Sequence, residues 1–195
     1  MVPRRHRLTF LMVAVAALAA WLAMPAAARA QSADVGAHAA FIDLGGLDTS
    51  AWGVGGRVGR EVLPMVALEG EVNVFPGDTD RVGSFVQALG GVKVGGRTPT
   101  FGLFAKLRPG VVRFDRDVIQ PGRVCVAVVP TPEECLASRT NAALDFGSVI
   151  EVYPAERLTL RVDVGSTYVW YGSRGDAGTR RYGNFQLNVG AAVRF

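Results

Sequence analysis

The last fourteen residues, Tyr182–Phe195, constrain the fold of this chain more than any other stretch. Apolar side chains stand at every second position, and polar or small ones stand between them. Since successive side chains of a strand point to opposite faces, this predicts a two-faced strand. It is about as long as a tilted strand needs to cross a bilayer. It ends on an aromatic residue, at a position where chains usually fray.

The first thirty residues are typical of a targeting segment. An arginine-rich start precedes an apolar run from Phe10 to Met24, and Ala-Arg-Ala at 28–30 offers a cleavage site. This order is typical of a secretory signal peptide. We therefore predict a cleaved signal peptide over residues 1–30 and one mature domain over residues 31–195, with an uncleaved anchor as the alternative.

The predicted leader also accounts for the basic character of the chain. The whole sequence has 21 Lys and Arg against 17 Asp and Glu. The leader holds four of the basic residues and no acidic one, so the mature chain is formally neutral. We therefore expect no nucleic-acid partner. We also expect no cofactor, because the Gly-rich run at 53–56 lies within a predicted strand and lacks the helix that a dinucleotide site needs.

Short runs of β-branched and aromatic residues recur along the mature chain without a helical period. They predict an all-β fold. No apolar run is long enough for a membrane-spanning helix. We expect strands over residues 35–44, 51–60, 66–75, 84–94, 100–114, 142–153, 158–171 and 182–195. Pro109 cannot donate to a ladder, so we expect a bulge or the membrane rim there.

The predicted connections alternate in length. Those after the odd-numbered strands span 45–50, 76–83, 115–141 and 172–181, and the others span 61–65, 95–99 and 154–157. The first connection is too short to help, so the pattern rests on the other three long ones. Long loops at one end and short turns at the other are typical of transmembrane barrels, whose turns lie in the periplasm.

Alternation alone does not say which face points outward, since a soluble lipocalin-like barrel alternates too. Aromatic residues near the strand ends, such as Trp52, Tyr168 and Trp170 at one end and Phe101 and Phe195 at the other, favour an apolar outer face in a membrane. The opposite face carries nearly balanced charges, as a narrow lumen requires. A neutral chain would also give this balance by chance. The predicted lumen network is Arg57, Glu69, Glu71, Lys93, Lys106, Arg108, Asp145, Glu151, Arg161, Asp163 and Arg194.

Two cysteines, Cys125 and Cys135, lie in the longest predicted loop. In an exported and oxidising context, an even count at short separation favours one disulfide. Two free thiols are the alternative. A metal site needs more ligands than this loop offers.

Taken together, residues 31–195 resemble the small eight-stranded outer-membrane barrels of bacteria, the OmpA-like and OmpX-like group. The run Gly-Leu-Phe-Ala-Lys-Leu-Arg-Pro-Gly at 102–110 is similar to the fifth strand of that group. The end on Phe195 is similar to its C-terminal insertion signal. The resemblance implies an eight-stranded antiparallel up-and-down transmembrane β-barrel in the bacterial outer membrane. Its implied partners are outer-membrane lipid and the barrel-insertion machinery. No peptidoglycan-binding domain follows, so we expect a barrel alone.

The same resemblance implies a non-enzymatic protein with a structural role, or with surface binding through residues 115–141 and 172–181 to a ligand that the sequence does not name. A diffusion pore is not expected, because a barrel of this size is filled by its own side chains. One alternative is an outer-membrane enzyme that hydrolyses or transfers the acyl chains of lipopolysaccharide. Its base would be His38, yet nothing in the sequence places a nucleophile beside this residue. A soluble periplasmic binding barrel is the other alternative.

Overall fold

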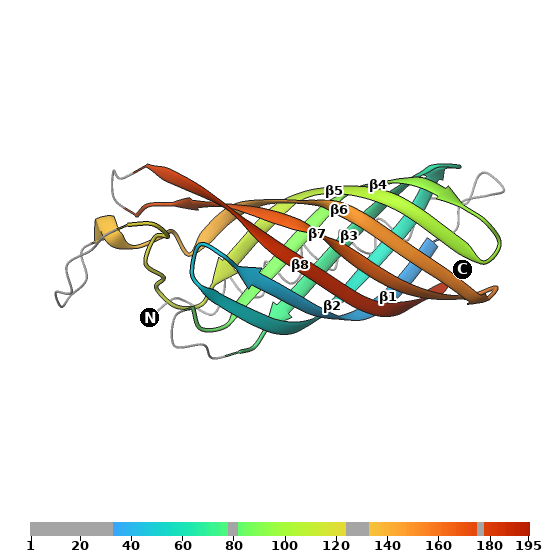
Figure 1. Cartoon of the computed structure of the whole chain (residues 1–195), viewed down its shortest axis with the longest axis horizontal. Coiled ribbons are helices and arrows are strands. Elements are labelled where there is room, and N and C mark those ends of the chain that lie inside the picture. Colours follow the sequence, from blue (N-terminus) through green and yellow to red (C-terminus); the bar gives the residue numbers. More distant parts are fainter. Residues whose placement is uncertain (1–32, 78–81, 124–132, 175–177) are drawn as a thin grey trace, which may run out of the picture. The chain divides into compact units, whose positions relative to one another are not determined.

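A computed structural model describes residues 33–77, 82–123, 133–174 and 178–195. Within these ranges eight antiparallel strands close into a barrel, each pairing with the next along the chain and the last with the first (Figure 1). The all-β, up-and-down prediction is confirmed. The predicted signal peptide lies outside the described residues. The strands are β1 (Ala33–Leu44), β2 (Thr49–Leu63), β3 (Val66–Phe75), β4 (Phe85–Arg97), β5 (Phe101–Phe114), β6 (Thr140–Ala155), β7 (Leu158–Gly172) and β8 (Thr179–Arg194).

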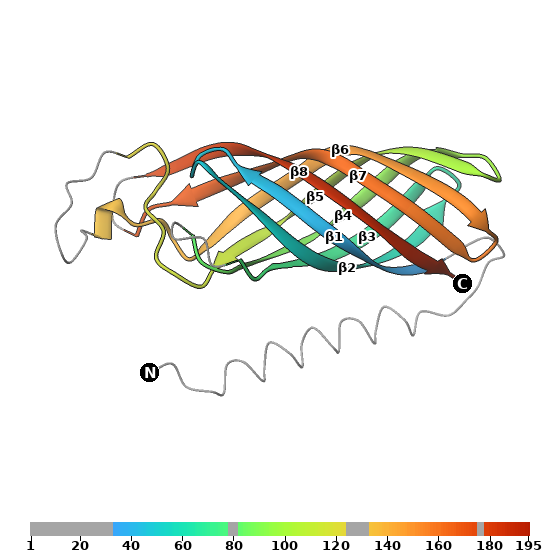
Figure 2. The same cartoon turned by 60° about the horizontal axis from the view of Figure 1, so that its bottom comes forward.

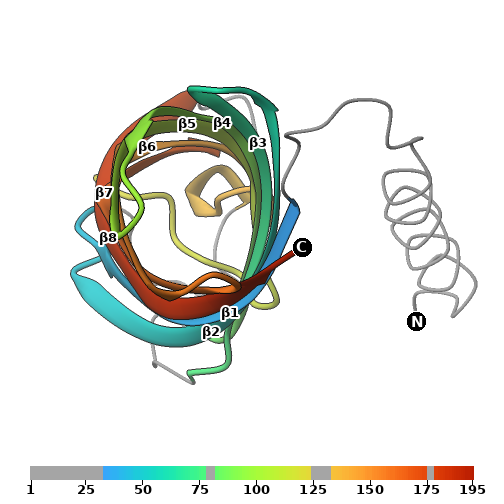
Figure 3. The ribbon, with the colours of Figure 1, turned by 90° about the vertical axis from the view of Figure 1, so that its right-hand side faces the viewer.

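The connections define two ends of the barrel. The loop end carries the connections after β1, β3, β5 and β7, and the one after β5 contains a short 3-10 helix, Glu133–Cys135. The turn end carries the tight connections after β2, β4 and β6. Seen along the barrel, the β5–β6 connection crosses the far opening (Figure 3). The described residues of this connection, which is the longest in the sequence, therefore lie across the mouth at the loop end.

Several strands run further than the sequence predicted. β2 continues through an irregularity in its register to Leu63, so the turn after it is confined to Pro64 and Met65. β8 begins at Thr179 instead of Tyr182, because β7 pairs with it as far as Gly172↔Thr179. The polar residues at the start of β8 lack the composition of a strand. Hydrogen bonding to the neighbouring strand β7 nevertheless holds these residues in a strand, and this pairing overrides their low intrinsic strand propensity.

Pro109 lies within β5, where the sequence predicted a bulge or the membrane rim. The pairing with β6 passes through Pro109↔Leu144 without a register shift, so the predicted bulge was wrong. On the other side, the ladder to β4 keeps its register but skips Arg108 and Pro109. The proline fits a continuous strand because the N–H that it lacks falls in this gap.

The outer face of the barrel is apolar. Trp52, Phe101, Leu103 and Phe195 are all more than 40% exposed, whereas most charged and amide side chains of the inner face are buried, with at most 8% of the residue exposed. A soluble barrel has the reverse arrangement, since it keeps its charges in water. No helix among the described residues has the length and apolar character needed to cross a membrane.

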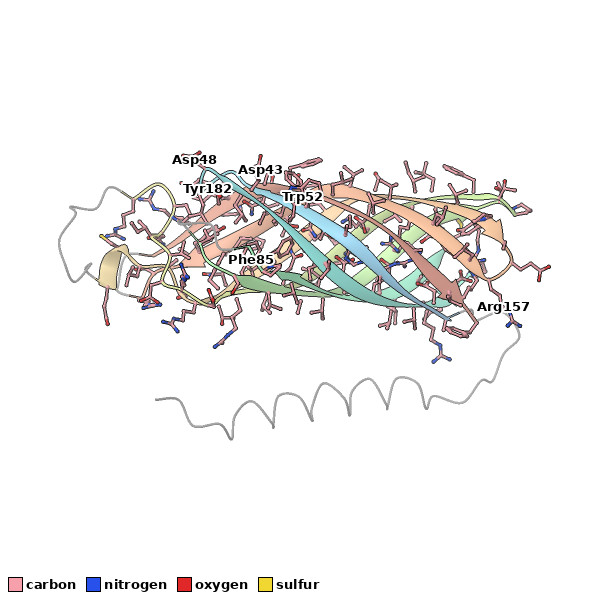
Figure 4. The ribbon with its side chains drawn as sticks, turned by 90° about the horizontal axis from the view of Figure 1, so that it is seen from below. Asp43, Asp48, Trp52, Phe85, Arg157 and Tyr182 are labelled. Carbon is pink, nitrogen blue, oxygen red and sulfur yellow. The ribbon has the colours of Figure 1, made fainter. Side chains whose placement is uncertain are left out.

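Near the loop end the inner face also becomes apolar, which the sequence reasoning did not predict. Aromatic residues from four strands form a cluster there, and apolar residues of the loops close over it. Phe85 and Tyr182 mark this end and Arg157 marks the turn end (Figure 4). The buried cluster consists of Ala40, Ile42, Leu44, Ala51, Phe75, Val82, Phe85, Leu89, Val112, Phe114, Val118, Ala137, Ala143, Val169 and Tyr171.

Candidate functional site: the filled lumen

Strand alternation brings the predicted charges from six strands into one lumen, because inward positions recur every second residue. Ten of the eleven predicted residues are at most 6% exposed. β2 contributes Arg57, β3 contributes Glu69 and Glu71, β4 contributes Lys93, β5 contributes Lys106 and Arg108, β6 contributes Asp145 and Glu151, and β7 contributes Arg161 and Asp163.

Arg108 and Asp145 form the first group of ion pairs. They stand opposite each other in the β5–β6 register. Arg108 Nε donates to Asp145 Oδ2 at 2.8 Å, and Arg108 Nη1 reaches Glu71 Oε2 of β3 at 2.6 Å. Lys106 Nζ lies 2.8 Å from Asp145 Oδ2 and also contacts Asp163. Each of these charges is therefore in contact with an opposite charge, as burial requires.

Arg161 organises the second group. Its Nη1 and Nη2 donate to the two carboxylate oxygens of Glu69 at 2.5 and 2.9 Å. Nη2 also donates to Asp163 Oδ2 at 2.9 Å, which joins the two groups. Lys93 Nζ bridges Glu151 at 2.6 Å and Glu69 at 3.2 Å. A bidentate contact between a guanidinium and a carboxylate pairs the two charges and also fixes the relative orientation of the two groups.

Arg194 is the predicted network member that the structure does not bring to a carboxylate among the described residues. Its guanidinium lies 4.4 Å from the centre of the Tyr153 ring, and its Nη2 donates to Thr159 Oγ1 at 3.3 Å. Asp34 was not predicted, yet it accepts from Arg57 Nη1 at 2.8 Å. The signal was present in the sequence. Asp34 continues the inward alternation of Gly36 and His38 by one step.

Arg57 also borders a small space inside the network. Its Nη2 is buried and has no hydrogen-bond partner within the described part of the chain. A cavity of ≈ 10 Å³ lies beside Arg57, His38, Glu71, Arg161, Asp163 and Asn188. This is about the space that one water molecule needs. The lumen is therefore densely filled at this level.

A layer of amide and hydroxyl side chains lies between the charges and the apolar cluster. Asn73 Nδ2 donates to Glu71 and to Gln87, both at 2.8 Å. Gln87 and Gln186 exchange two hydrogen bonds of 3.1 Å across the lumen, and Thr167 donates to Gln186 Oε1 at 2.6 Å. Sequence reasoning missed this layer because it considered charged residues only.

His38 lies where this layer meets the charged residues. Its Nε2 lies 2.6 Å from Asn73 Oδ1 and 3.8 Å from Glu71 Oε1. Ser84, a serine that could serve as a nucleophile, donates instead to Asp115 at 2.7 Å. Among the described residues, no group of His, Cys, Asp and Glu is arranged to hold a metal ion.

The aromatic cluster forms an inner lid, which we define as Phe75, Phe85, Phe114 and Tyr171. The Phe75 and Phe85 rings stack with centroids 4.5 Å apart. Phe85 lies 5.4 Å from Phe114, and Phe114 lies 6.1 Å from Tyr171. Such offset contacts between buried rings add to the stability gained by burying their area.

Outside the barrel, Asp117 joins two loops. Arg174 of the β7–β8 connection donates to both of its carboxylate oxygens, at 2.5 and 3.0 Å. Arg139 of the β5–β6 connection donates to Oδ1 at 3.0 Å. The hydrogen bonds from Arg174, supported by those from Arg139, lower the pKa of Asp117 to about 2. Sequence reasoning missed this cluster, since no periodic pattern places loop residues.

The remaining predicted site residues lie at the two ends. Cys135 is buried and is not a free thiol. Cys125 lies outside the described residues, so their pairing stays a prediction. Phe195 extends the ladder past β8, because its N–H donates to Ala33 O at 2.8 Å, and its side chain is 76% exposed.

The family model described as "Outer membrane protein beta-barrel domain" matches residues 13–195. The chain belongs to this family. The protein is therefore located in the bacterial outer membrane. A search of curated proteins found no match to the chain.

Solved structures of outer-membrane barrels are similar to this chain at low sequence identity. The N-terminal barrel domain of OprF from Pseudomonas aeruginosa is 12% identical with a TM-score of 0.51, covering 84% of this chain and 97% of that one. Neisserial surface protein A is 12% identical with a TM-score of 0.46, covering 84% and 94%. OprG from Pseudomonas aeruginosa is 11% identical with a TM-score of 0.48, covering 85% and 96%.

Proposed function

We propose that this outer-membrane barrel is a non-enzymatic protein with a lumen closed to ions, a structural role in the membrane and a surface-binding role at its outer loops. The observation that carries this proposal is the ion-pair network around Arg108 and Arg161. It places buried, mutually paired charges across the whole lumen. An ion crossing the barrel would have to break these contacts without water to replace them.

Two further features support a closed lumen. The amide layer around Gln87 and Gln186 spans the barrel above the charges. The inner lid then closes the loop end with aromatic rings, which cannot replace the water around an ion. A hydrated ion would therefore meet a charged, a polar and an apolar barrier in series.

The surroundings of His38 support a non-enzymatic role. A catalytic base needs a nucleophile or acid within hydrogen-bond reach. His38 faces Asn73 and the interior of the barrel, with 8% of the residue exposed. A lipid substrate would lie on the outer face and would have no path to this ring.

We also propose contacts with two partners, outer-membrane lipid and the barrel-insertion machinery. Lipid would surround the exposed aromatic residues Trp52 and Phe101. The insertion machinery would bind the closing strand through Phe195, whose side chain stays exposed beside the first strand.

The closed lumen is tested with protein reconstituted in a planar bilayer. We expect only a small conductance, and faster migration on a gel without boiling, because a closed barrel resists unfolding by detergent. A large, steady conductance from protein that passes the gel test would contradict the proposal. Protein that fails the gel test is not folded and is excluded from the conductance measurement.

A further inference from the structure

Strand β8 runs past the end of its neighbour β1. β7 pairs with β8 up to Thr179, whereas the pairing of β1 with β8 ends at Asp43↔Phe185. The β7–β8 hairpin therefore extends beyond the β1–β2 hairpin at the loop end (Figures 1 and 2). Residues 179–183 have a strand on one side only within the described part of the chain.

The backbone hydrogen bonds at the two ends of β8 show which backbone groups of residues 179–183 face away from β7. Gly178 O accepts from Ser173, and Arg194 N donates to Arg157 O, so even-numbered residues of this stretch turn toward β7. Phe195 N donates to Ala33 O, so odd-numbered residues turn toward β1. Backbone groups alternate along a strand in this way. The N–H and C=O of residues 179, 181 and 183 therefore point to the side that β1 does not reach.

These residues form what we call the β8 edge, Thr179–Gly183. Thr179, Arg180 and Arg181 are exposed. The β1–β2 turn approaches Gly183, where a Cβ on Gly45 would lie 3.6 Å from Gly183 O, so the open part centres on Arg181. No backbone hydrogen bond among the described residues reaches Arg181 from that side. Such an edge is a template for another strand.

The β8 edge is also basic. Arg180 Nη1 donates to the backbone oxygen of Gly122 at 2.7 Å, and the Arg181 guanidinium lies 5.1 Å from the Tyr168 ring centre. Neither guanidinium is paired with a carboxylate of the described residues. An added strand would place its side chains directly opposite Arg180 and Arg181, where acidic residues are favoured.

We infer that the β8 edge binds an extended acidic segment of a partner protein outside the cell by β-strand addition. The segment runs antiparallel to β8 and continues the ladder where β1 ends. A second copy of this chain fits poorly. Two barrels in one membrane point the same way, so their β8 edges would run parallel and bring like charges together. The inference rests on the proposed surface-binding role and not on the closed lumen.

The test uses the full mature protein, refolded in lipid nanodiscs, and a fluorescent probe peptide. The probe is Thr-Val-Glu-Glu-Val-Thr, blocked at both ends, and its binding is followed by anisotropy. We expect saturable binding that weakens with salt. Arg181→Pro removes an N–H that faces away from β7, so the barrel stays folded by the gel test. We expect it to weaken binding about tenfold or more.

Control variants and a control peptide distinguish backbone pairing at the β8 edge from attraction to its positive charge. Arg181→Gln keeps the N–H, so we expect weaker binding with less dependence on salt. Arg113→Gln removes an exposed arginine that donates to Thr140 Oγ1 at 3.3 Å, and it should leave binding unchanged. A peptide N-methylated at alternate residues on its pairing edge should not bind the unaltered protein, which keeps the test independent of folding in any variant.

Absence of probe binding to the folded protein would overturn the inference. Equal binding by the N-methylated peptide or by folded Arg181→Pro would also overturn it, because either result means that backbone pairing is not used. Conductance is measured on the same samples. If the protein conducts ions and binds the probe, only the proposal of a closed lumen is refuted. If it does not conduct ions and does not bind the probe, only the inference of strand addition at the β8 edge is refuted.

Discussion

Arg161 of β7 reaches across the lumen and holds Glu69 of β3 by both carboxylate oxygens, at 2.5 and 2.9 Å. The two residues lie on strands that are not neighbours in the barrel. Their contact therefore ties opposite walls together. Substitutions at these two residues therefore test whether the charges of the lumen stabilise the barrel.

We expect Arg161→Ala to lower the free energy of unfolding by about 3–5 kcal/mol, because it leaves Glu69 buried without its main partner. Glu71→Ala should also lower the free energy of unfolding, because it removes the carboxylate that Arg108 Nη1 contacts at 2.6 Å inside the lumen. Urea unfolding in lipid vesicles, followed by tryptophan fluorescence, measures the change. The matched control is Arg113→Ala on the outer face, which should cost about 0.5 kcal/mol or less. Losses near zero for both lumen variants would contradict the buried network.

A double-mutant cycle on the same pair separates coupling from desolvation. Replacing Arg161 and Glu69 together by Met and Leu removes both charges. We expect a smaller loss than for either single replacement, because no charge is left buried alone. Additive losses in the urea experiment would mean that the two side chains do not act on each other.

The inner lid provides a test away from the charges. Phe85 is 2% exposed, stacks on Phe75 and makes a tilted ring contact with Phe114. Phe85→Ala should cost about 3–5 kcal/mol through the cavity that it leaves. Phe85→Leu, which keeps most of the volume, should cost clearly less. Conductance should remain small in both variants because the charged layer is unchanged. A large conductance in folded Phe85→Ala would show that the lid alone closes the lumen.

The Asp117 ion pairs predict a dependence on pH. The pKa of Asp117 lies at about 2, below its ordinary value of 3.8. A lowered pKa means that the folded state favours the carboxylate. The stability that the Asp117 carboxylate contributes to the folded protein is therefore complete above about pH 4, and it is lost as the pH falls toward 2. NMR titration of the carboxyl group should give this low pKa, and Arg174→Gln should raise it. A titration at the ordinary value in the unaltered protein would contradict the loop contact.

The disulfide remains to be tested directly. Cys125 and Cys135 should be bonded, because the protein is exported and the count is even. Closing a loop this short would stabilise the outer end by about 2–3 kcal/mol. Thiol labelling of the denatured, unreduced protein should find no free cysteine. Stoichiometric labelling of both residues would refute the pairing.

The sequence by itself determined the number of strands, their order and the orientation of most side chains. Those properties follow from the alternation of neighbouring residues, which Phe185 and Gln186 illustrate on opposite faces. Alternation is local, so it does not need the barrel to close. In the structure, ten of the eleven residues of the predicted lumen network are at most 6% exposed, and Arg194 has no carboxylate partner among the described residues.

Only the tertiary structure decided how those residues meet. Arg161 and Glu69 are 92 positions apart, and their pairing depends on the register of all strands between them. The inner lid depends on closure in the same way. Phe75, Phe85 and Phe114 stand at strand ends on the inward face, where the sequence pattern predicts polar residues. They became a buried cluster because the loops of the β3–β4 and β5–β6 connections fold over the mouth, and no local pattern encodes that contact.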